Sequence, residues 1–218
     1  ISGADSLTWN AALGNPGGGI SGNEGASNRL WYYVAPAAFL GDQSVMSGGS
    51  ITWDIRNIGG GTPASETADV ILDGAGIRIG YPIPGNIDLP AWQTFSVPLS
   101  PTGWFHMDSF PTPSLLGPVT ESEFAAVLAG VTAMYVQGEY RNGNDTSALD
   151  NVIMAPAPTI CPECAADYDG NGGVDGGDLA SFFSDFEAGE GCADVDGNGG
   201  VDGGDLAEFF AVFEAGGC

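Results

Sequence analysis

A stretch of fifteen residues near the end of the chain is written twice, at residues 166–180 and again at residues 193–207. In each copy, a twelve-residue segment carries oxygen-bearing side chains at positions 1, 3, 5, 9 and 12, with Gly at position 6. A hard divalent cation takes about six to eight oxygen ligands, and a short loop encloses it only if one residue reverses the chain. The pattern therefore predicts two calcium loops, because an acidic, flexible, glycine-rich tail does not explain two copies in register.

Each predicted loop assigns a role to six residues. Positions 1, 3 and 5 supply side-chain oxygens, position 7 its carbonyl, position 9 a direct or water-mediated contact, and position 12 the closing carboxylate. In the first loop these residues are Asp167, Asp169, Asn171, Gly173, Asp175 and Asp178. In the second loop they are Asp194, Asp196, Asn198, Gly200, Asp202 and Asp205. Gly172 and Gly199, at position 6, are expected to reverse the chain.

A short amphipathic helix is expected after each loop, beginning at the closing carboxylate. Apolar residues recur at helical spacing and form one stripe on each helix. The stripes are Leu179, Phe182, Phe183 and Phe186 in the first helix, and Leu206, Phe209, Phe210 and Phe213 in the second. The two stripes can pack on each other. Too few residues precede either loop to form the entering helix of an EF-hand.

Residues 161–218, with their tandem of calcium loop and exiting helix closed by Asp at position 12, resemble the dockerin family of secreted bacterial proteins. The resemblance implies a non-catalytic module that plugs into a partner domain, commonly a cohesin. Dockerins that bind cohesins usually carry hydroxyl residues at loop positions 10 and 11. This chain has Gly176-Gly177 and Gly203-Gly204 there, which favours a docking scaffold over a standard cohesin partner.

The excess of acidic residues affects two expectations, the need of the C-terminal module for metal and the classes of partner that the chain can bind. The chain has 28 acidic residues against 4 basic ones, a net charge of −24, and no basic residue follows Glu163. Clustered carboxylates repel one another without a cation, so the C-terminal module is expected to unfold on chelation. Nucleic acid and bare anionic membranes are disfavoured as partners, because binding them needs clustered Lys and Arg. No run of 18 or more apolar residues predicts a membrane span.

Four cysteines bracket the repeats: Cys161, Cys164, Cys192 and Cys218. An even set in a small, apparently secreted module favours two disulfides, which would strengthen a thin core. A structural zinc site at the first two cysteines is the alternative, although the only His, His106, lies elsewhere. Tandem loop–helix units pack about a pseudo-twofold axis, so the expected pairs are Cys161–Cys192 and Cys164–Cys218.

The first part of the chain, residues 1–154, alternates short β-rich runs with Gly and Pro. The expected strands are residues 30–34, 49–55, 68–72, 76–80, 92–99, 131–136 and 149–154, with one strand or two in residues 1–30. One helix is expected after Thr120, where Glu123 completes a capping box and Gly130 ends the segment. Many short strands with one short helix predict a mainly β sandwich or jelly roll.

An ordered series of segments from about residue 28 to residue 154 resembles the laminin IV (laminin B) domain. The series runs through residues 31–42, 47–51, 69–77, 97–99 and 103–104, the expected helix ending in Leu128, and residues 149–152. The resemblance implies a β-jelly roll like that of carbohydrate-binding modules, found in extracellular matrix and surface proteins, with no catalytic residues.

Related jelly rolls often hold a structural calcium ion between an N-terminal loop and a carboxylate on the last strand. Asp150 stands on the last expected strand, and the loop from Asn15 to Ile20 could offer carbonyl oxygens. Either a third calcium binds there or Asp150 caps a turn. The metal content of the chain would distinguish the two.

No active site emerges from the sequence. There is no Gly-x-Ser-x-Gly motif or reactive Cys for His106 to serve, and acidic residues alone do not define a glycosidase. Several aromatic residues could stack on sugars, but their alternation along strands favours the core, and an exposed pair would indicate a glycan platform. They are Trp31, Tyr32, Tyr33, Trp53, Trp92 and Trp104. Asn144 begins the single glycosylation sequon.

Together these features predict a body at residues 1–154, a Pro-rich linker at residues 155–160 and a calcium module at residues 161–218. The expected function is that of a non-enzymatic extracellular assembly or adhesion protein. Its partner would be a cohesin-like protein, a surface protein or the next copy of the chain in a head-to-tail fibre. The alternative is a carbohydrate-binding module attached through its dockerin-like part. The start at Ile1 fits a secreted protein after removal of its signal peptide.

Overall fold

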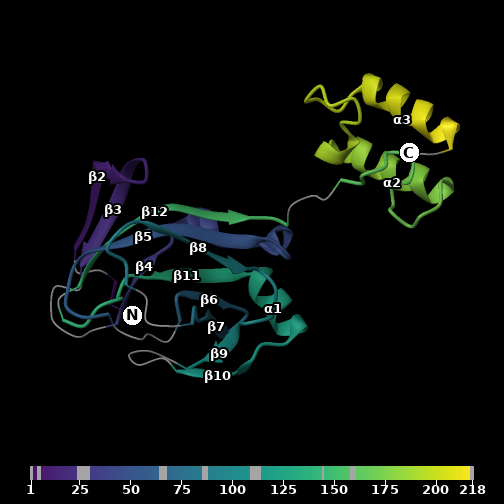
Figure 1. Ribbon diagram of the computed structural model, residues 1–218. Helices are drawn as coiled ribbons and strands as arrows, with labels where there is room; N and C mark the ends of the chain where they lie inside the picture. Colours follow the sequence, from purple (N-terminus) through teal and green to yellow (C-terminus); the bar gives the residue numbers. More distant parts are fainter. Residues whose placement is uncertain are drawn as a thin grey trace. The chain divides into compact units, whose positions relative to one another are not determined.

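The computed structural model divides the chain into two compact units, residues 1–157 and residues 158–218 (Figure 1). The structure describes residues 2–3, 6–23, 30–63, 68–84, 88–108, 114–143, 145–157 and 161–216. The boundary between the units falls within the Pro-rich segment that the sequence predicts as a linker. No helix in the described ranges has the length and apolar character needed to cross a membrane.

The first unit is a sandwich of two sheets. One sheet has the order β1 (Ser2–Gly3), β4 (Trp31–Val34), β11 (Val131–Gln137), β6 (Val70–Gly74), β7 (Ile77–Tyr81), β9 (Phe105–Met107), β10 (Leu115–Pro118). The other has the order β2 (Ser6–Gly14), β3 (Gly17–Asn23), β12 (Thr146–Ala155), β5 (Ser50–Gly59), β8 (Gln93–Pro98). Neighbouring strands are antiparallel except β1 and β4. The predicted fold class, a mainly β sandwich with a small helical C-terminal part, is confirmed.

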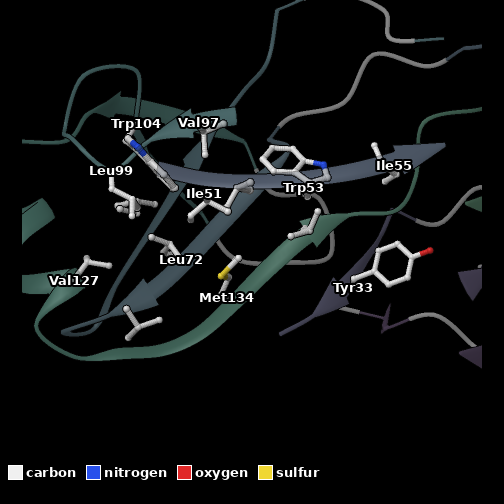
Figure 2. Close-up of a cluster of buried hydrophobic side chains, with 14 of the residues drawn as sticks. Tyr33, Ile51, Trp53, Ile55, Leu72, Val97, Leu99, Trp104, Val127 and Met134 are labelled. Carbon is white, nitrogen blue, oxygen red and sulfur yellow. The ribbon is translucent and has the colours of Figure 1, made fainter. Parts of the chain in front are cut away.

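The core lies between the two sheets because inward residues alternate along the strands. On β5, Ile51, Trp53 and Ile55 are fully buried. Figure 2 shows Ile51 near Leu72 and Met134, which lie on strands of the other sheet. Fully buried aromatic side chains such as Trp53, Trp31 and Trp104 contribute much of the apolar area that stabilises a domain of this size.

The helix α1 (Glu121–Leu128) begins as the sequence predicts. Thr120 accepts from the backbone of Glu123, and the Glu123 side chain accepts from the Thr120 backbone. The apolar face buries Phe124 and Val127, and the helix packs beside β6. Two short 3-10 helices, η1 (Ala37–Phe39) and η2 (Ser44–Met46), complete the described helical segments of this unit.

The second unit consists of two loops, each followed by a helix. The helices are α2 (Gly176–Ala188) and α3 (Gly203–Ala215), with the 3-10 helix η3 (Gly191–Ala193) between them. Phe182 and Phe209 stack with ring centroids 3.9 Å apart and nearly parallel planes, so the predicted packing of the two stripes is confirmed. The stripes are narrower than predicted, because Phe183 and Phe210 are 38% and 36% exposed.

Candidate metal sites

Three carboxylates of the first repeated loop converge. Asp167, Asp169 and Asp178 each offer an oxygen atom, and these atoms all lie within 4.8 Å of one another. Three negative charges at this separation repel strongly unless a cation lies among them. The oxygen donors and the spacing suit a hard divalent cation such as calcium.

Asp178 is fully buried, and the backbone keeps it ionised. Its oxygens accept hydrogen bonds from the N–H groups of Asp169 at 3.0 Å and Asp175 at 2.7 Å. These bonds hold the pKa of the Asp178 carboxyl below its usual range, although burial acts in the opposite direction. The bond from Asp169 has the largest effect. The Asp178 side chain is therefore a carboxylate at neutral pH.

The carboxylate of Asp167 is only half satisfied by the protein. Its Oδ2 accepts from the Gly172 N–H at 2.9 Å. Its Oδ1 is buried and has no hydrogen-bond partner among the described residues. Buried polar atoms are nearly always paired, so this oxygen needs a partner that the described part of the chain does not supply. A calcium ion bound by the three carboxylates would be that partner.

The second loop repeats this geometry atom by atom. Asp194, Asp196 and Asp205 converge within the same 4.8 Å, and Oδ1 of Asp194 is again buried without a partner in the described ranges. The carboxylate of Asp205 accepts from the backbone of Asp202 at 2.8 Å and of Asp196 at 3.1 Å. These bonds lower the pKa of the Asp205 carboxyl, and the bond from Asp202 has the largest effect. Two equivalent sites follow from two copies of one local sequence.

The glycines at position 6 adopt the backbone that the sequence predicts. Gly172 and Gly199 have φ angles of +89° and +92°, in the left-handed region that a residue without a Cβ enters readily. Gly170 and Gly197, at position 4, also have φ near +68°, a second reversal that the ligand spacing did not predict. Each loop therefore turns twice around its carboxylates.

The asparagines at position 5 lie in the loops but use their oxygens locally. The Oδ1 atom of Asn171 accepts from the Gly173 N–H at 2.9 Å, and its amide donates to Asp169 at 2.8 Å. Asn198 makes the same contacts, at 3.0 Å to Gly200 and at 2.8 Å to Asp196. Both predicted asparagine ligands thus border the carboxylate cluster.

The expectation that each helix begins at the closing carboxylate is wrong by two residues. The first helix begins at Gly176, and Asp175 caps its N-terminus by accepting from the Gly177 N–H at 2.7 Å. Asp178 is the third helical residue and completes a capping box. The second helix repeats this with Asp202 as its cap. The cause is that position 9 is better placed than position 12 to satisfy the free N–H groups of the first turn.

One of the two expected disulfides is confirmed. Cys161 and Cys192 are bonded, with Cα atoms 4.9 Å apart. Cys164 is disulfide-bonded too, which disfavours the zinc alternative, while Cys218 lies outside the described residues. The confirmed bond joins the start of one repeat to the start of the other and so fixes the two loops relative to each other.

The structure brings Asp150 to the N-terminal loop, as the sequence predicts. Its carboxylate accepts from the Asn15 N–H at 2.6 Å, and it lies directly across from Asp54 on β5. Asn151 donates to both Asp54 and the Asn15 carbonyl at 2.7 Å. A Cβ at Gly14 would come within 2.5 Å of the Asp150 carboxylate, so only glycine fits there. Asp54 was not predicted as part of this cluster.

Burial raises the pKa of Asp54, but hydrogen bonds from Thr94, Asn151 and Asn15 outweigh it and hold that pKa below its usual range. Acidic side chains directly opposite each other on neighbouring strands destabilise a sheet unless a cation or hydrogen-bond donors separate them. Asp54 could have been identified only from its position opposite Asp150. That position follows from the pairing of β12 with β5, which the sequence alone does not give.

Most candidate aromatic residues belong to the core, as predicted. The buried ones are Trp31, Tyr32, Tyr33, Trp53 and Trp104. Trp92 is half-buried, with the Arg56 guanidinium 5.0 Å from its ring. The most exposed tryptophan is Trp9, on β2, which the sequence did not single out. His106 contacts Glu123 of the helix at 3.2 Å, and Asn144 of the sequon lies outside the described residues.

The sequence missed an open groove on the seven-stranded sheet. It has a volume of about 450 Å³ and lies around the ion pair of Asp73 and Arg78, whose two hydrogen bonds measure 2.6 and 2.7 Å. Met107 and Ile77 supply apolar lining, and Thr132 supplies a hydroxyl. These residues lie on the four strands β6, β7, β9 and β11, so no local pattern in the sequence marks them.

Laminin subunit gamma-2 of Homo sapiens is 31% identical over an alignment covering 63% of this chain and 13% of the relative. The same subunit of Equus caballus matches to the same extent. The chain thus spans a small part of the length of these relatives.

Two solved structures are similar to this chain at low identity. The L4b domain of human laminin alpha-2 gives a TM-score of 0.47 at 17% identity, covering 56% of this chain and 68% of that domain. A family 11 carbohydrate-binding module from Clostridium thermocellum gives 0.44 at 15% identity, covering 72% and 88%.

The sequence model of the laminin B (domain IV) family matches residues 32–163, more than half of the chain. This range agrees with the ordered series of β segments in the sequence and ends at the start of the repeated module. The chain therefore belongs to the laminin B (domain IV) family.

Proposed function

We propose that this chain is a non-enzymatic extracellular structural or adhesion protein. Its β sandwich serves as the body, and its calcium-loaded C-terminal module, of the dockerin type, docks onto another protein. Membership of the laminin B family supports an extracellular role. The converged carboxylates of the two loops, each with one unpartnered buried oxygen, carry the proposal for calcium.

Calcium gives the module its shape in this proposal. The module carries only acidic charges after Glu163, and two calcium ions neutralise part of them while fixing the N-termini of both helices. Phe183 and Phe210, whose ring centroids lie 6.2 Å apart, then form an exposed aromatic pair on the two helices. Aromatic side chains are frequent anchors in protein interfaces. The partner is a surface or cohesin-like protein, or the body of the next copy.

Docking onto the body of the next copy would be a head-to-tail contact, which propagates into a fibre unless the rotation closes a ring. Negative-stain images and size-exclusion chromatography in calcium test this. Calcium-dependent fibres that disappear with Phe183→Ser and Phe210→Ser support docking through the helices. Fibres that persist in excess chelator contradict it.

The Asp54 and Asp150 cluster is proposed as a third calcium site. Its two facing carboxylates and the glycine-restricted turn beside them support this. Metal analysis of the full chain after gel filtration tests it, with Asp150→Asn as the variant. The expected result is one calcium fewer per chain than in the unmodified protein, and an unchanged content means that Asp150 only caps the turn.

The second candidate function is carbohydrate binding by the body. The groove around Asp73 and Arg78 supports it, because a bidentate ion pair beside apolar walls presents donors and acceptors suited to sugar hydroxyls. Affinity electrophoresis in soluble β-glucan and xylan tests it. Retardation that is lost with Arg78→Ala favours this function, and equal migration of both proteins in every gel contradicts binding through this groove.

A further inference from the structure

The strand β2 is the outer strand of the five-stranded sheet. Among the described residues it pairs only with β3, so one edge of its backbone carries unpaired N–H and C=O groups. Figure 1 shows the β2–β3 hairpin standing away from the rest of the sandwich. The first seven of its nine residues are exposed, on both faces of the strand.

Apolar side chains lie along this open strand. Trp9 is 68% exposed and Leu7 is 61% exposed. Trp9 is paired with Ile20, which in turn is paired with the buried Leu149, so the apolar row of the core continues outward to the strand edge. The Trp9 indole lies over Gly18, where an added Cβ would come within 2.9 Å of the ring. One edge of the ring thus lies against the hairpin backbone, and the rest is exposed.

The other three sheet edges are protected and β2 is not. The strand β1 is two residues long, β10 has four residues and ends at Pro118, and β8 has six residues and ends at Pro98. The strand β2 has nine residues without proline or charge. Proteins usually shorten edge strands or place Pro or charged residues on them, because an open edge pairs with other chains.

The charge distribution indicates which chain would pair there. Two copies of a chain with net charge −24 repel each other over most of their surface. Residues 6–23, the whole β2–β3 hairpin, contain no charged side chain. This hairpin is therefore a surface where two copies can approach without opposing like charges.

We propose that β2 pairs antiparallel with β2 of a second copy of this chain, joining the two five-stranded sheets edge to edge. Such a contact is isologous, since the same residues meet on both sides of a twofold axis. Backbone hydrogen bonds supply pairing, and Leu7 and Trp9 of one copy cover those of the other. This body-to-body contact is separate from docking by the C-terminal module and does not depend on it.

Sedimentation velocity of the full chain over a concentration series tests the proposal. The expected result is a concentration-dependent shift in sedimentation coefficient from one chain to two, which persists with Phe183→Ser and Phe210→Ser because β2 lies outside the C-terminal module. A single chain at every concentration overturns the proposal. A shift that is lost with these two substitutions overturns it too and points to the C-terminal module.

Charged substitutions on β2 test directly whether this strand forms the contact. Trp9→Glu and Trp9→Lys, each alone, are expected to stay monomeric through like-charge repulsion across the axis. An equal mixture of the two is expected to recover pairs, because opposite charges then meet. Leu116→Glu, on the exposed edge strand β10, is the matched control and leaves pairing unchanged. Far-UV circular dichroism checks that each variant is folded.

Two results at this strand contradict the proposal. The first is a Trp9→Glu variant that pairs as well as the unmodified chain. The second is a monomeric protein that binds soluble β-glucan and loses this binding with Trp9→Ala, which would make Trp9 a sugar platform.

Discussion

Asp178 and Asp205 occupy the same position in the two repeats, and each holds its own loop against the helix that follows it. Each is buried and accepts two backbone hydrogen bonds that connect its loop to the first turn of its helix. An amide at either position would keep the shape but would lose the charge and turn an N–H₂ group towards a backbone donor. Loop closure and the proposed metal binding therefore depend on the same side chain.

Replacing Asp178 with Asn is expected to reduce calcium affinity of the first loop by more than about tenfold, since even loss of a ligand's supporting contacts costs roughly that much. Isothermal titration of the full chain measures it, with Asp205→Asn as the equivalent change in the second loop. Glu187→Gln removes one exposed charge from the same helix and serves as the control. Equal affinities in all three variants would contradict the assignment of the closing ligand.

Asp69 gives the body its own pH dependence. Burial raises the pKa of its carboxyl to about 6, against hydrogen bonds from the Ile83 N–H and the Tyr140 hydroxyl. In the unfolded chain this pKa returns to 3.8. The folded state thus holds the proton more tightly, and the stability from this group is complete below about pH 4 and lost as pH rises through about 6.

Urea unfolding of the unmodified chain and of Asp69→Asn from about pH 4 to about pH 7 measures this effect. The free energy of unfolding of the unmodified chain, relative to the variant, is expected to fall by roughly 3 kcal/mol over that range. Comparing the two proteins cancels the titration of the calcium loops. Parallel pH curves would show that Asp69 is not protonated in the folded state.

At the scale of elements, the stacked pair of Phe182 and Phe209 holds α2 and α3 together. Both rings are fully buried, whereas Phe183 and Phe210 are partly exposed beside them. Phe182→Ala is expected to destabilise the second unit by about 3–5 kcal/mol, and Phe183→Ala by much less. Chemical unfolding in saturating calcium compares the two, and similar losses would mean that both rings share one core.

The sequence predicts elements well where the signal is local. The two loops, the capping box at Thr120 and the alternation along β5 each depend on residues within about a dozen positions, and each appears in the structure. The three-residue strand β9 and the four-residue strand β10 were missed because such short segments show no periodicity. Asp54 and the groove at Arg78 were missed because strand pairing, not sequence spacing, assembles them.

For the whole molecule, two units imply two unfolding events. Chelation of calcium is expected to lower the melting temperature of the second unit strongly, because its carboxylates then repel one another. The body is expected to keep most of its stability, apart from any share due to the Asp150 cluster. Calorimetry of the full chain with and without EGTA measures both transitions. A single transition that shifts as one would contradict independent units.

The disulfide between Cys161 and Cys192 has a mechanical consequence. Tension that enters the module from the preceding segment reaches Cys161 first and passes through the sulfur atoms to Cys192, 31 residues further along the chain. The first loop and α2 lie inside that shortcut, so stretching cannot extend them while the bond holds. About 100 Å of chain therefore cannot be extended by tension while the bond holds, and the first repeated loop lies within this length.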